Sequence, residues 1–275
     1  MVVAERALPE MALPEAERVI YETNPLEEVI CQVRFPRILK LETEAPSGFQ
    51  ERIRSDYPIY KRNQGLSLGG LPQSLAEIMS REFPSASTPR SHEFESRDGN
   101  WVLTLNPESL ALTCKRYSRW EDFRSRLEDA LATFLALYPS SFYVRLGLRY
   151  KNVIRRSRLG LSESSWSELL RPWILGAYSR PEMRDEVEHH YLQTMLRLAD
   201  EQGHVIITSG TVRDLKAGEE CYLIDADFFI EKQTECADAH DKLDLLNAQS
   251  DRFFHWCIEE RLHHAFLPRP SLVES

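Results

Sequence analysis

The order of predicted elements is the feature of this 275-residue chain that most constrains its fold. Apolar alternation and turn residues predict a strand, a short helix, three strands and a long helix, and the same order then follows a second time. Hairpin connections make neighbouring strands antiparallel, and each long helix needs an apolar surface against which to bury its stripe. We therefore predict an α+β protein in which two duplicated units form an antiparallel sheet, covered on one face by two long helices.

The first half is predicted to span 23–140 and the second 141–275, as one continuous domain. In the first half we expect strands at 27–35, 91–96, 101–106 and 110–117, with helices at 48–57 and 119–138. In the second half we expect strands at 141–154, 186–199, 204–212 and 221–231, with helices at 166–178 and 238–266. Residues 1–22 are predicted to be a mobile arm, and the Pro-, Gly- and Ser-rich stretch 58–90 an insertion with one helix at 75–82. Taken twice, this order is similar in topology to the saddle of the TATA-box-binding protein.

Composition sets limits on function. The chain carries 34 basic and 43 acidic residues, a net charge of −9, and 42% hydrophobic residues. This composition is typical of a globular protein and argues against one that wraps duplex DNA or lies on an anionic membrane. The sequence has no apolar run of membrane-spanning length. Its first residues have neither the basic segment nor the uninterrupted apolar stretch of a secretory signal, so we expect no such signal. Its five widely spaced cysteines form no CxxC pair, so we predict reduced thiols and a cytoplasmic protein.

Several motifs spread over nearly the whole chain resemble one protein family. They are NPLEEV at 24–29, VRFP at 33–36, FQERI at 49–53, YVRLGLRYKN at 143–152, DADFF at 225–229 and the helix 243–262. The chain resembles, through these motifs, a sporadically distributed family of uncharacterised prokaryotic proteins of about this length. The resemblance implies no particular activity. The patchy distribution of the family implies mobile genes, such as those of defence or toxin–antitoxin systems.

The strand at 141–154 and its exit carry six cations without one acidic residue: Arg145, Arg149, Lys151, Arg155, Arg156 and Arg158. Strand alternation predicts that Tyr143, Arg145, Arg149 and Lys151 point away from the helices. One interpretation is a stripe that binds an anion or a partner, with Tyr143 stacking on a base or a side chain.

The alternative interpretation is that these cations meet carboxylates on a neighbouring strand. The strand at 221–231 places Asp225, Asp227 and Glu231 on the same side, within a segment, 213–251, that holds eleven acidic and four basic residues. Cross-strand ion pairs on an exposed face contribute only about 0.2–1 kcal/mol each, so they would fix register more than stability. We favour this alternative, which still leaves a charge-patterned surface suited to a specific partner.

Catalytic and metal-binding signals are weak. His255, Glu259 and His263 lie at i, i+4 and i+8 of the last predicted helix and would need a fourth metal ligand such as His240 or His264. Asp225 and Asp227 have the spacing of a carboxylate pair, but carboxylates beside arginines are more often ion-paired than catalytic. The sequence has no HExxH, GxSxG or phosphate-loop motif. We therefore predict no metal, no cofactor and no catalytic residues.

The leading functional prediction is a non-catalytic protein–protein interaction module, with a role as an accessory or neutralising component of a mobile defence or toxin–antitoxin system. Its predicted binding residues are Tyr143, Arg145, Arg149, Lys151, Arg155, Arg156, Asp225 and Asp227. One alternative is nucleic-acid binding through the basic stretch 143–158. A second is a small-ligand or enzyme pocket between sheet and helices, with Asp225, Asp227 and Arg149 at its mouth. We expect no membrane partner.

Overall fold

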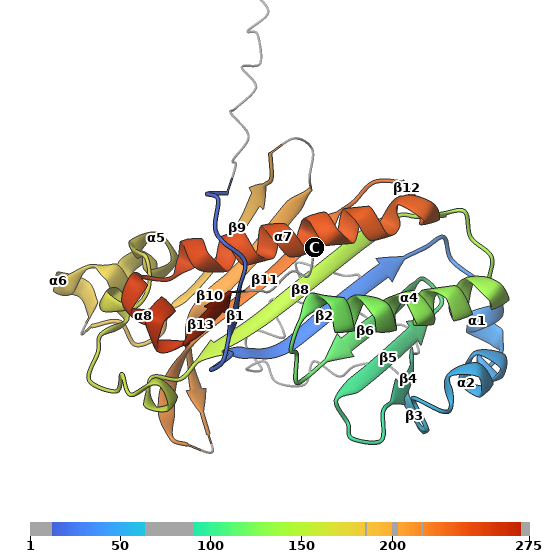
Figure 1. Ribbon diagram of the computed structural model, residues 1–275, viewed down its shortest axis with the longest axis horizontal. Coiled ribbons are helices and arrows are strands. Elements are labelled where there is room, and N and C mark those ends of the chain that lie inside the picture. The colour runs from blue at the N-terminus through green and yellow to red at the C-terminus, as the bar shows by residue number, and fades with distance from the viewer. Residues whose placement is uncertain (1–12, 64–90, 185, 200–202, 216, 271–275) are drawn as a thin grey trace, which may run out of the picture. The chain divides into compact units, whose positions relative to one another are not determined.

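The computed structural model describes residues 13–63, 91–184, 186–199, 203–215 and 217–270 (Figure 1). The chain divides into two compact units, which we describe separately. Unit 1 comprises Met1–Val29, Gly147–Glu231 and His240–Ser275, and unit 2 comprises Ile30–Leu146 and Lys232–Ala239. Most strands belong to a large antiparallel sheet, which confirms the predicted α+β class.

Unit 2 is a sheet with a helix packed on it. Its strands pair in the order β3 (Ile59–Asn63), β4 (Ser91–Glu95), β5 (Trp101–Asn106), β6 (Ser109–Cys114) and β2 (Leu26–Arg34), the last from residue 30 onward. Helix α4 (Trp120–Leu137) lies over this sheet (Figure 1). Its buried stripe recurs every three or four residues, and Phe134 stacks on Phe35 with ring centroids 4.5 Å apart.

Smaller elements complete unit 2. They are α1 (Lys40–Thr43), α2 (Ser47–Ile53), β7 (Phe142–Tyr143), β12 (Thr234–Glu235) and the 3₁₀ turn Cys236–Asp238. In α2 the apolar residues Phe49 and Ile53 are four apart and both are buried, which is the pattern that predicted this helix. Phe49 meets Phe94 of β4 edge to face, so α2 is held against the sheet.

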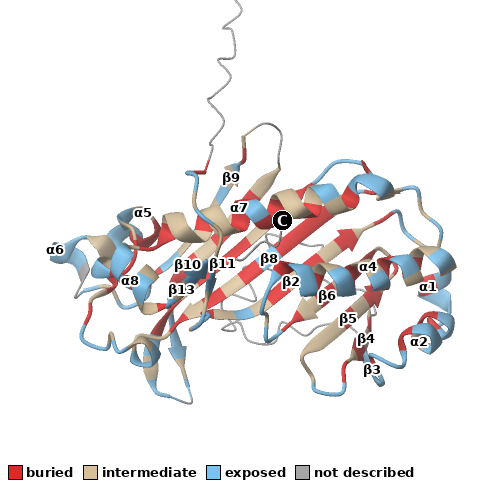
Figure 2. Ribbon diagram, viewed as in Figure 1, coloured by how far each residue is buried: buried red, intermediate tan, exposed pale blue. Residues whose placement is uncertain are grey.

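Unit 1 also contains antiparallel strands and a long helix. Its strands pair in the order β8 (Arg145–Ile154), the first from residue 147 onward, then β11 (Glu219–Ile230), β10 (His204–Asp214) and β9 (Tyr191–Arg197). Helix α7 (Ala239–Cys257) lies over β8 and β11 (Figure 1), where Phe253 contacts Phe228 and Tyr150 donates a hydrogen bond to the Asn247 side chain. Buried residues run along β8 and β11, while β9 alternates between exposed and half-buried residues (Figure 2).

The remaining elements of unit 1 are short. They are the strands β1 (Val19–Tyr21) and β13 (Pro268–Pro270), the helices α5 (Pro172–Leu175), α6 (Pro181–Arg184) and α8 (Glu260–Ala265), and the 3₁₀ turns Ser157–Leu159, Trp166–Glu168 and Gly176–Ser179. The single helix predicted at 166–178 is therefore wrong. Pro172 restricts the backbone before it, and Gly176 takes a positive φ of 50°, so the segment breaks into separate turns.

The last predicted helix is also interrupted. Instead of one helix over 238–266, α7 ends at Cys257 and α8 begins at Glu260. Between them, Ile258 forms an antiparallel bridge with Leu170, and the backbone N–H of Glu259 donates to the carbonyl of Leu169. The apolar periodicity continues through this break, so a pairing with a distant loop overrides the helical pattern of the sequence.

The predicted strand 141–154 bends at Val144, which separates β7 from β8. Tyr143 and Leu146 are both buried although an unbroken strand would place them on opposite faces. The bend shifts the alternation between the two strands. The prediction that Tyr143 lies on the face opposite the helices is therefore wrong, and the predicted alternation holds only within β8.

The N-terminal arm and the insertion are described only in part. Residues 19–21 of the predicted arm form β1, which pairs with β13, so this part of the arm is docked. Residues 59–63 of the predicted insertion form β3, which pairs with β4. The helix predicted at 75–82 lies outside the described residues. None of the described helices is long and apolar enough to cross a membrane.

A buried polar network fastens α5 to the sheet of unit 1. The Tyr222 hydroxyl donates to the carbonyl oxygen of Ile174 over 2.7 Å, and the Ser209 hydroxyl donates to the same oxygen over 3.3 Å. His190 lies 3.2 Å from the Tyr222 hydroxyl oxygen. Burial raises the pKa of Tyr222, so this group remains a donor. The network satisfies polar groups that water does not reach.

We expect Tyr222→Phe to lower the free energy of unfolding by about 1–3 kcal/mol, because it removes the main donor to a buried carbonyl. Tyr138→Phe is the matched control, since Tyr138 is half-buried directly after the end of α4, and its effect should stay below about 0.5 kcal/mol. Urea unfolding followed by circular dichroism measures both. Equal effects of the two substitutions would show that the Tyr222 hydroxyl does not hold α5.

Candidate functional site

The candidate site is the face of the unit 1 sheet that points away from α7. Two rows of directly opposed residues cross its strands: Asp225, Thr208 and Gln193 in one, and Asp227, Ile206 and Met195 in the next. Arg149 and Lys151 of β8 complete the surface beside Asp225. We call these eight residues the outer face. Opposed residues of antiparallel strands share a face, so the register alone brings them together.

Arg149 and Asp225 form an ion pair between β8 and β11 on the outer face. The guanidinium Nε donates to Asp225 Oδ1 over 2.7 Å, and Nη2 donates to Oδ2, so the pairing uses both carboxylate oxygens. The Asp225 side chain is only 8% exposed, whereas that of Arg149 is 47% exposed. The hydrogen bonds from Arg149 to Asp225 raise the pKa of the guanidinium. A two-fold pairing of this kind fixes geometry as well as charge.

The cations at the end of β8 are also paired. Arg155 donates from Nε to Asp214 over 2.9 Å and forms a second ion pair with Glu27. Arg156 lies over the Trp166 ring, 4.4 Å from its centroid, and its Nη2 is 3.5 Å from Glu220 Oε1. The Trp166 indole N–H donates to the same carboxylate oxygen. Both arginines therefore hold local structure together.

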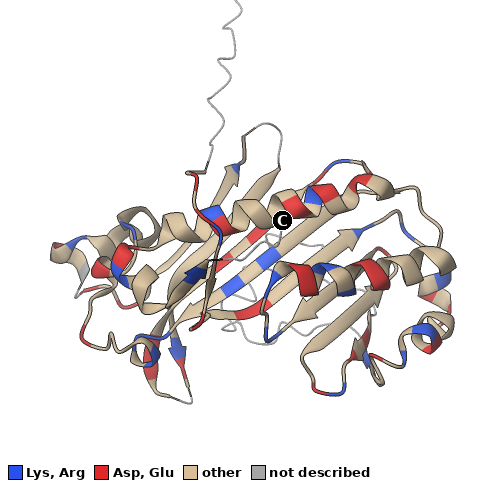
Figure 3. Ribbon diagram, viewed as in Figure 1, with Lys and Arg blue, Asp and Glu red and all other residues tan. Residues whose placement is uncertain are grey.

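Three arginines of the basic run at 145–158 thus form ion pairs with carboxylates of the acidic segment 213–251. Figure 3 shows acidic and basic segments interleaved over unit 1. Arg145 is half-buried and also interacts with other groups, so it is not a free cation. Lys151 forms no ion pair with another residue of the described part of the chain. The interpretation of cross-strand ion pairs is confirmed for one pair, Arg149 with Asp225.

Tyr143 does not belong to the outer face. Its side chain is 1% exposed and lies in unit 2, where β7 pairs with β12 through Tyr143 and Thr234. Burial raises the pKa of the Tyr143 hydroxyl, and the neighbouring Cys236 adds to this increase. The phenol ring is therefore inaccessible for stacking on a base.

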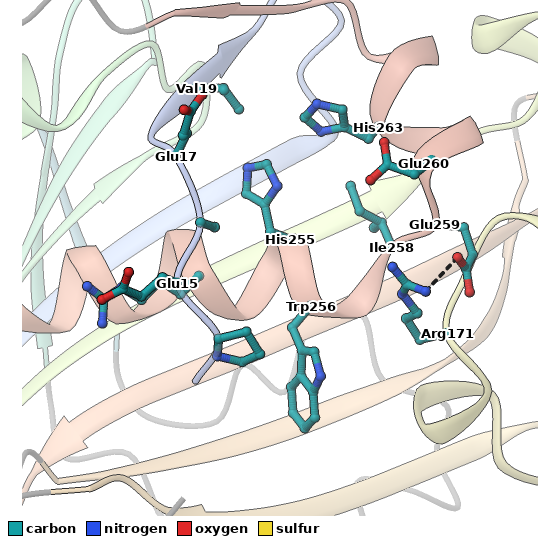
Figure 4. Close-up of a pocket in the computed structure, with 13 residues that line it drawn as sticks. Glu15, Glu17, Val19, Arg171, His255, Trp256, Ile258, Glu259, Glu260 and His263 are labelled. Atoms are coloured by element: carbon teal, nitrogen blue, oxygen red, sulfur yellow. Dashed lines mark ion pairs between the residues drawn. The ribbon is translucent and has the colours of Figure 1, made fainter. Parts of the chain in front are cut away.

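The histidines of the last helical segments meet around a residue that the sequence did not single out. Tyr21 of β1 places its hydroxyl 2.9 Å from His263 Nδ1 and 3.4 Å from His255 Nε2. Glu259 does not join them, because it forms an ion pair with Arg171 over 2.8 Å (Figure 4). Within the described residues, no group of three or more His, Cys, Asp or Glu side chains is arranged to hold a metal ion. The cluster ties the N-terminal strand to α7 and α8.

Two cavities lie away from the outer face. One of about 370 Å³ lies between the segment before β1 and helices α7 and α8, and includes His255, His263 and Trp256 (Figure 4). The other, of about 640 Å³, lies in unit 2 and includes Arg126, whose guanidinium sits over the Trp101 ring. Neither cavity is lined by Arg149, Asp225 or Asp227, the residues predicted at the mouth of a pocket.

Comparison with known proteins gives no family. No protein-family model matches the chain, and no curated protein matches it. The resemblance to a sporadic prokaryotic family therefore stays a prediction.

We expect Arg149→Met to destabilise the protein by about 1–3 kcal/mol, because it leaves the buried Asp225 carboxylate without its cation. Arg158→Met at the strand exit is the matched control and should change stability by less than about 0.5 kcal/mol, since Arg158 is exposed. Urea unfolding measures both. In a double-mutant cycle with Asp225→Asn, the two losses should add to more than the loss of the double variant. Strict additivity would show that the ion pair does not couple the strands.

Acidification should destabilise the protein through His255. Burial lowers the pKa of His255, and the neighbouring His263 lowers it further, with Glu260 opposing this shift. The unfolded chain then binds more protons below about pH 6.5, so stability is lost as the pH falls through that value. Burial lowers the pKa of His92 and His190 in the same direction.

We expect His255→Gln to make this loss smaller between pH 7.5 and 5.5, as measured by urea unfolding at the two values. His264→Gln is the control, because the His264 side chain is 74% exposed, and it should leave the pH dependence unchanged. If both variants keep the slope of the parent protein, the Tyr21 and histidine cluster does not contribute to acid sensitivity.

Proposed function

We propose that this chain is a non-catalytic protein-binding module and that the outer face of unit 1 is its partner surface. The observation that carries the proposal is the Arg149–Asp225 ion pair. It holds a half-exposed guanidinium in a fixed position on β8, at one end of a sheet face that also presents Ile206, Thr208 and Met195. Arg and Met are enriched in protein interfaces, and a preorganised charge loses little freedom on binding.

The charge of the outer face supports a protein partner over a nucleic acid. The outer face carries two cations, Arg149 and Lys151, and two carboxylates, Asp225 and Asp227, so its net charge is close to zero. Arg155 and Arg156, which a nucleic-acid site would need, are occupied by Glu27, Asp214 and Glu220. Binding to a polyanion requires several cations that can neutralise phosphates. A balanced pattern of both signs instead favours a protein surface with complementary charges.

Lys151 gives the partner a specific chemistry. It is the cation of the outer face without an ion pair to a described residue, so we propose that the partner places a carboxylate opposite its ammonium group. Exposed charges at the rim of an interface steer association and suppress wrong partners. The biological role that the family resemblance suggests, an accessory or neutralising component of a mobile defence or toxin–antitoxin system, is part of the same proposal.

The experiment is affinity purification of the full chain from its native host, followed by quantitative mass spectrometry. We expect one stoichiometric protein partner, and Lys151→Glu should reduce its recovery at least tenfold. Lys242→Glu on α7 is the matched control, because it makes the same charge change at a half-buried position on the helical side. It should leave the recovery unchanged.

Two results would contradict the proposal. The first is a partner that both variants retain or lose equally, since the outer face would then not be the binding surface. The second is tight binding of single-stranded RNA or DNA, measured by fluorescence anisotropy at low salt, that weakens steeply as salt is raised. That result would favour the basic stretch 143–158 as a nucleic-acid site.

We further propose that the two halves of the chain arose by duplication. The support is that β2 neighbours the last strand of the β4–β5–β6 series in unit 2, and β8 neighbours the last strand of the β9–β10–β11 series in unit 1. A cytoplasmic location is also part of the proposal, supported by five free cysteines, four of which are buried.

A further inference from the structure

We propose that strand β9 pairs edge to edge with β9 of a second copy of this chain, antiparallel and with the two-fold axis at Thr194. On one side β9 is paired with β10 over seven residues. On its other side it pairs with no strand of the described part of the chain. The unpaired backbone N–H and C=O groups of such an edge are a template for another strand.

The composition of β9 is unusual for an edge that remains in water. Edge strands are commonly protected by lysine, proline, bulges or very short length. β9 has seven residues, Tyr-Leu-Gln-Thr-Met-Leu-Arg, and its one charge is Arg197 at the end. By contrast β3, which ends the strand order in unit 2, has five residues and carries Lys61 and Arg62 in its middle. The sequence of β9 therefore lacks the features that keep an edge unpaired.

The sequence of β9 is complementary to itself. An antiparallel pair centred on Thr194 aligns all seven residues of both strands. Each residue then faces the residue of the second copy that lies equally far from Thr194 on its other side. Tyr191 then faces Arg197 of the second copy, and Leu192 faces Leu196. No like charges are opposed, apolar residues meet each other, and the guanidinium lies over an aromatic ring. A two-fold axis repeats each of these contacts.

The exposure of β9 indicates what the pairing would cover. Met195 is 57% exposed and Tyr191 48% exposed, both on the outer face side of the strand. On the opposite side Leu192 and Leu196 are half-buried. Pairing removes part of this apolar surface from water, in addition to forming the backbone hydrogen bonds. The second copy thus fits the strand through both backbone and side chains.

This inference goes beyond the proposed function, because it uses the backbone edge of β9 and does not need Lys151 or a second protein. The contact between two seven-residue strands is small, and interfaces that bury less than about 1,200 Å² are typical of weak complexes. The dimer should therefore be sought at a high chain concentration, roughly 200 µM. Sedimentation equilibrium of the full chain should then give a mass approaching twice the 32.0 kDa of one chain.

Thr194→Lys tests the axis. It places two ammonium groups opposite each other at the two-fold, and it should return the mass to that of one chain. Thr104→Lys is the matched control, because Thr104 is a half-buried strand residue of unit 2 that lies opposite Glu93. It should leave the dimer intact. Circular dichroism and urea unfolding establish that both variants fold.

Cysteine cross-linking gives a second, independent test that does not perturb the fold. At the two-fold, the Cα atoms of residue 194 in the two copies would be about 4.5–5.5 Å apart, within the range of a disulfide. Under mild oxidation Thr194→Cys should form a covalent dimer. Gln193→Cys should cross-link at least tenfold more slowly, because residue 193 faces residue 195 of the other copy. The parent chain, whose five native cysteines remain, gives the background.

A single-chain mass at the high concentration would overturn the inference. So would a dimer that persists in a folded Thr194→Lys variant, or equal cross-linking of the two cysteine variants, since the contact would then lie elsewhere. If Thr194→Lys does not fold, the ratio of cross-linking rates decides. None of these results depends on the partner expected at Lys151, so the two proposals can fail separately.

Discussion

Strand β11 is the element on which unit 1 depends, because its alternate residues serve both faces of the sheet. On one face Tyr222 and Phe228 hold α5 and α7. On the other, Asp225 receives the guanidinium of Arg149. The eleven paired positions with β10 fix this alternation, since a slip of one residue would move the carboxylate into the apolar layer and the tyrosine into water. Register therefore decides packing and surface chemistry together.

The ion pairs of unit 1 limit what its surface can bind. A run of cations in a sequence indicates a polyanion site only if those cations remain available. Here Arg149, Arg155 and Arg156 are each used within the fold, and all three are matched by acidic residues more than fifty positions away. What remains is a nearly neutral face with one ammonium group, Lys151, that a partner can contact. The proposal of a protein partner follows from this balance and not from total charge.

Local patterns predicted most of the strands and the first long helix. The alternation of Val29, Cys31 and Val33 marked β2, and the spacing of Phe123, Leu127 and Phe134 marked α4, because these patterns record burial on one side of an element. The errors came where distant segments compete with the local pattern. Ile258 joins Leu170 instead of continuing a helix, and the bend at Val144 turns Tyr143 into the interior.

The sequence by itself determined the class of the fold, the alternation of residues along most strands, and the expectation that the basic run meets carboxylates of a neighbouring strand, because these depend on short-range periodicity and on charge. Only the tertiary structure decided that Tyr21 lies beside His255 and His263, that Glu259 turns to Arg171, and that β9 ends the sheet of unit 1. The reason is physical. Such contacts join residues far apart in the chain, and their geometry depends on where whole elements pack, which no local pattern records.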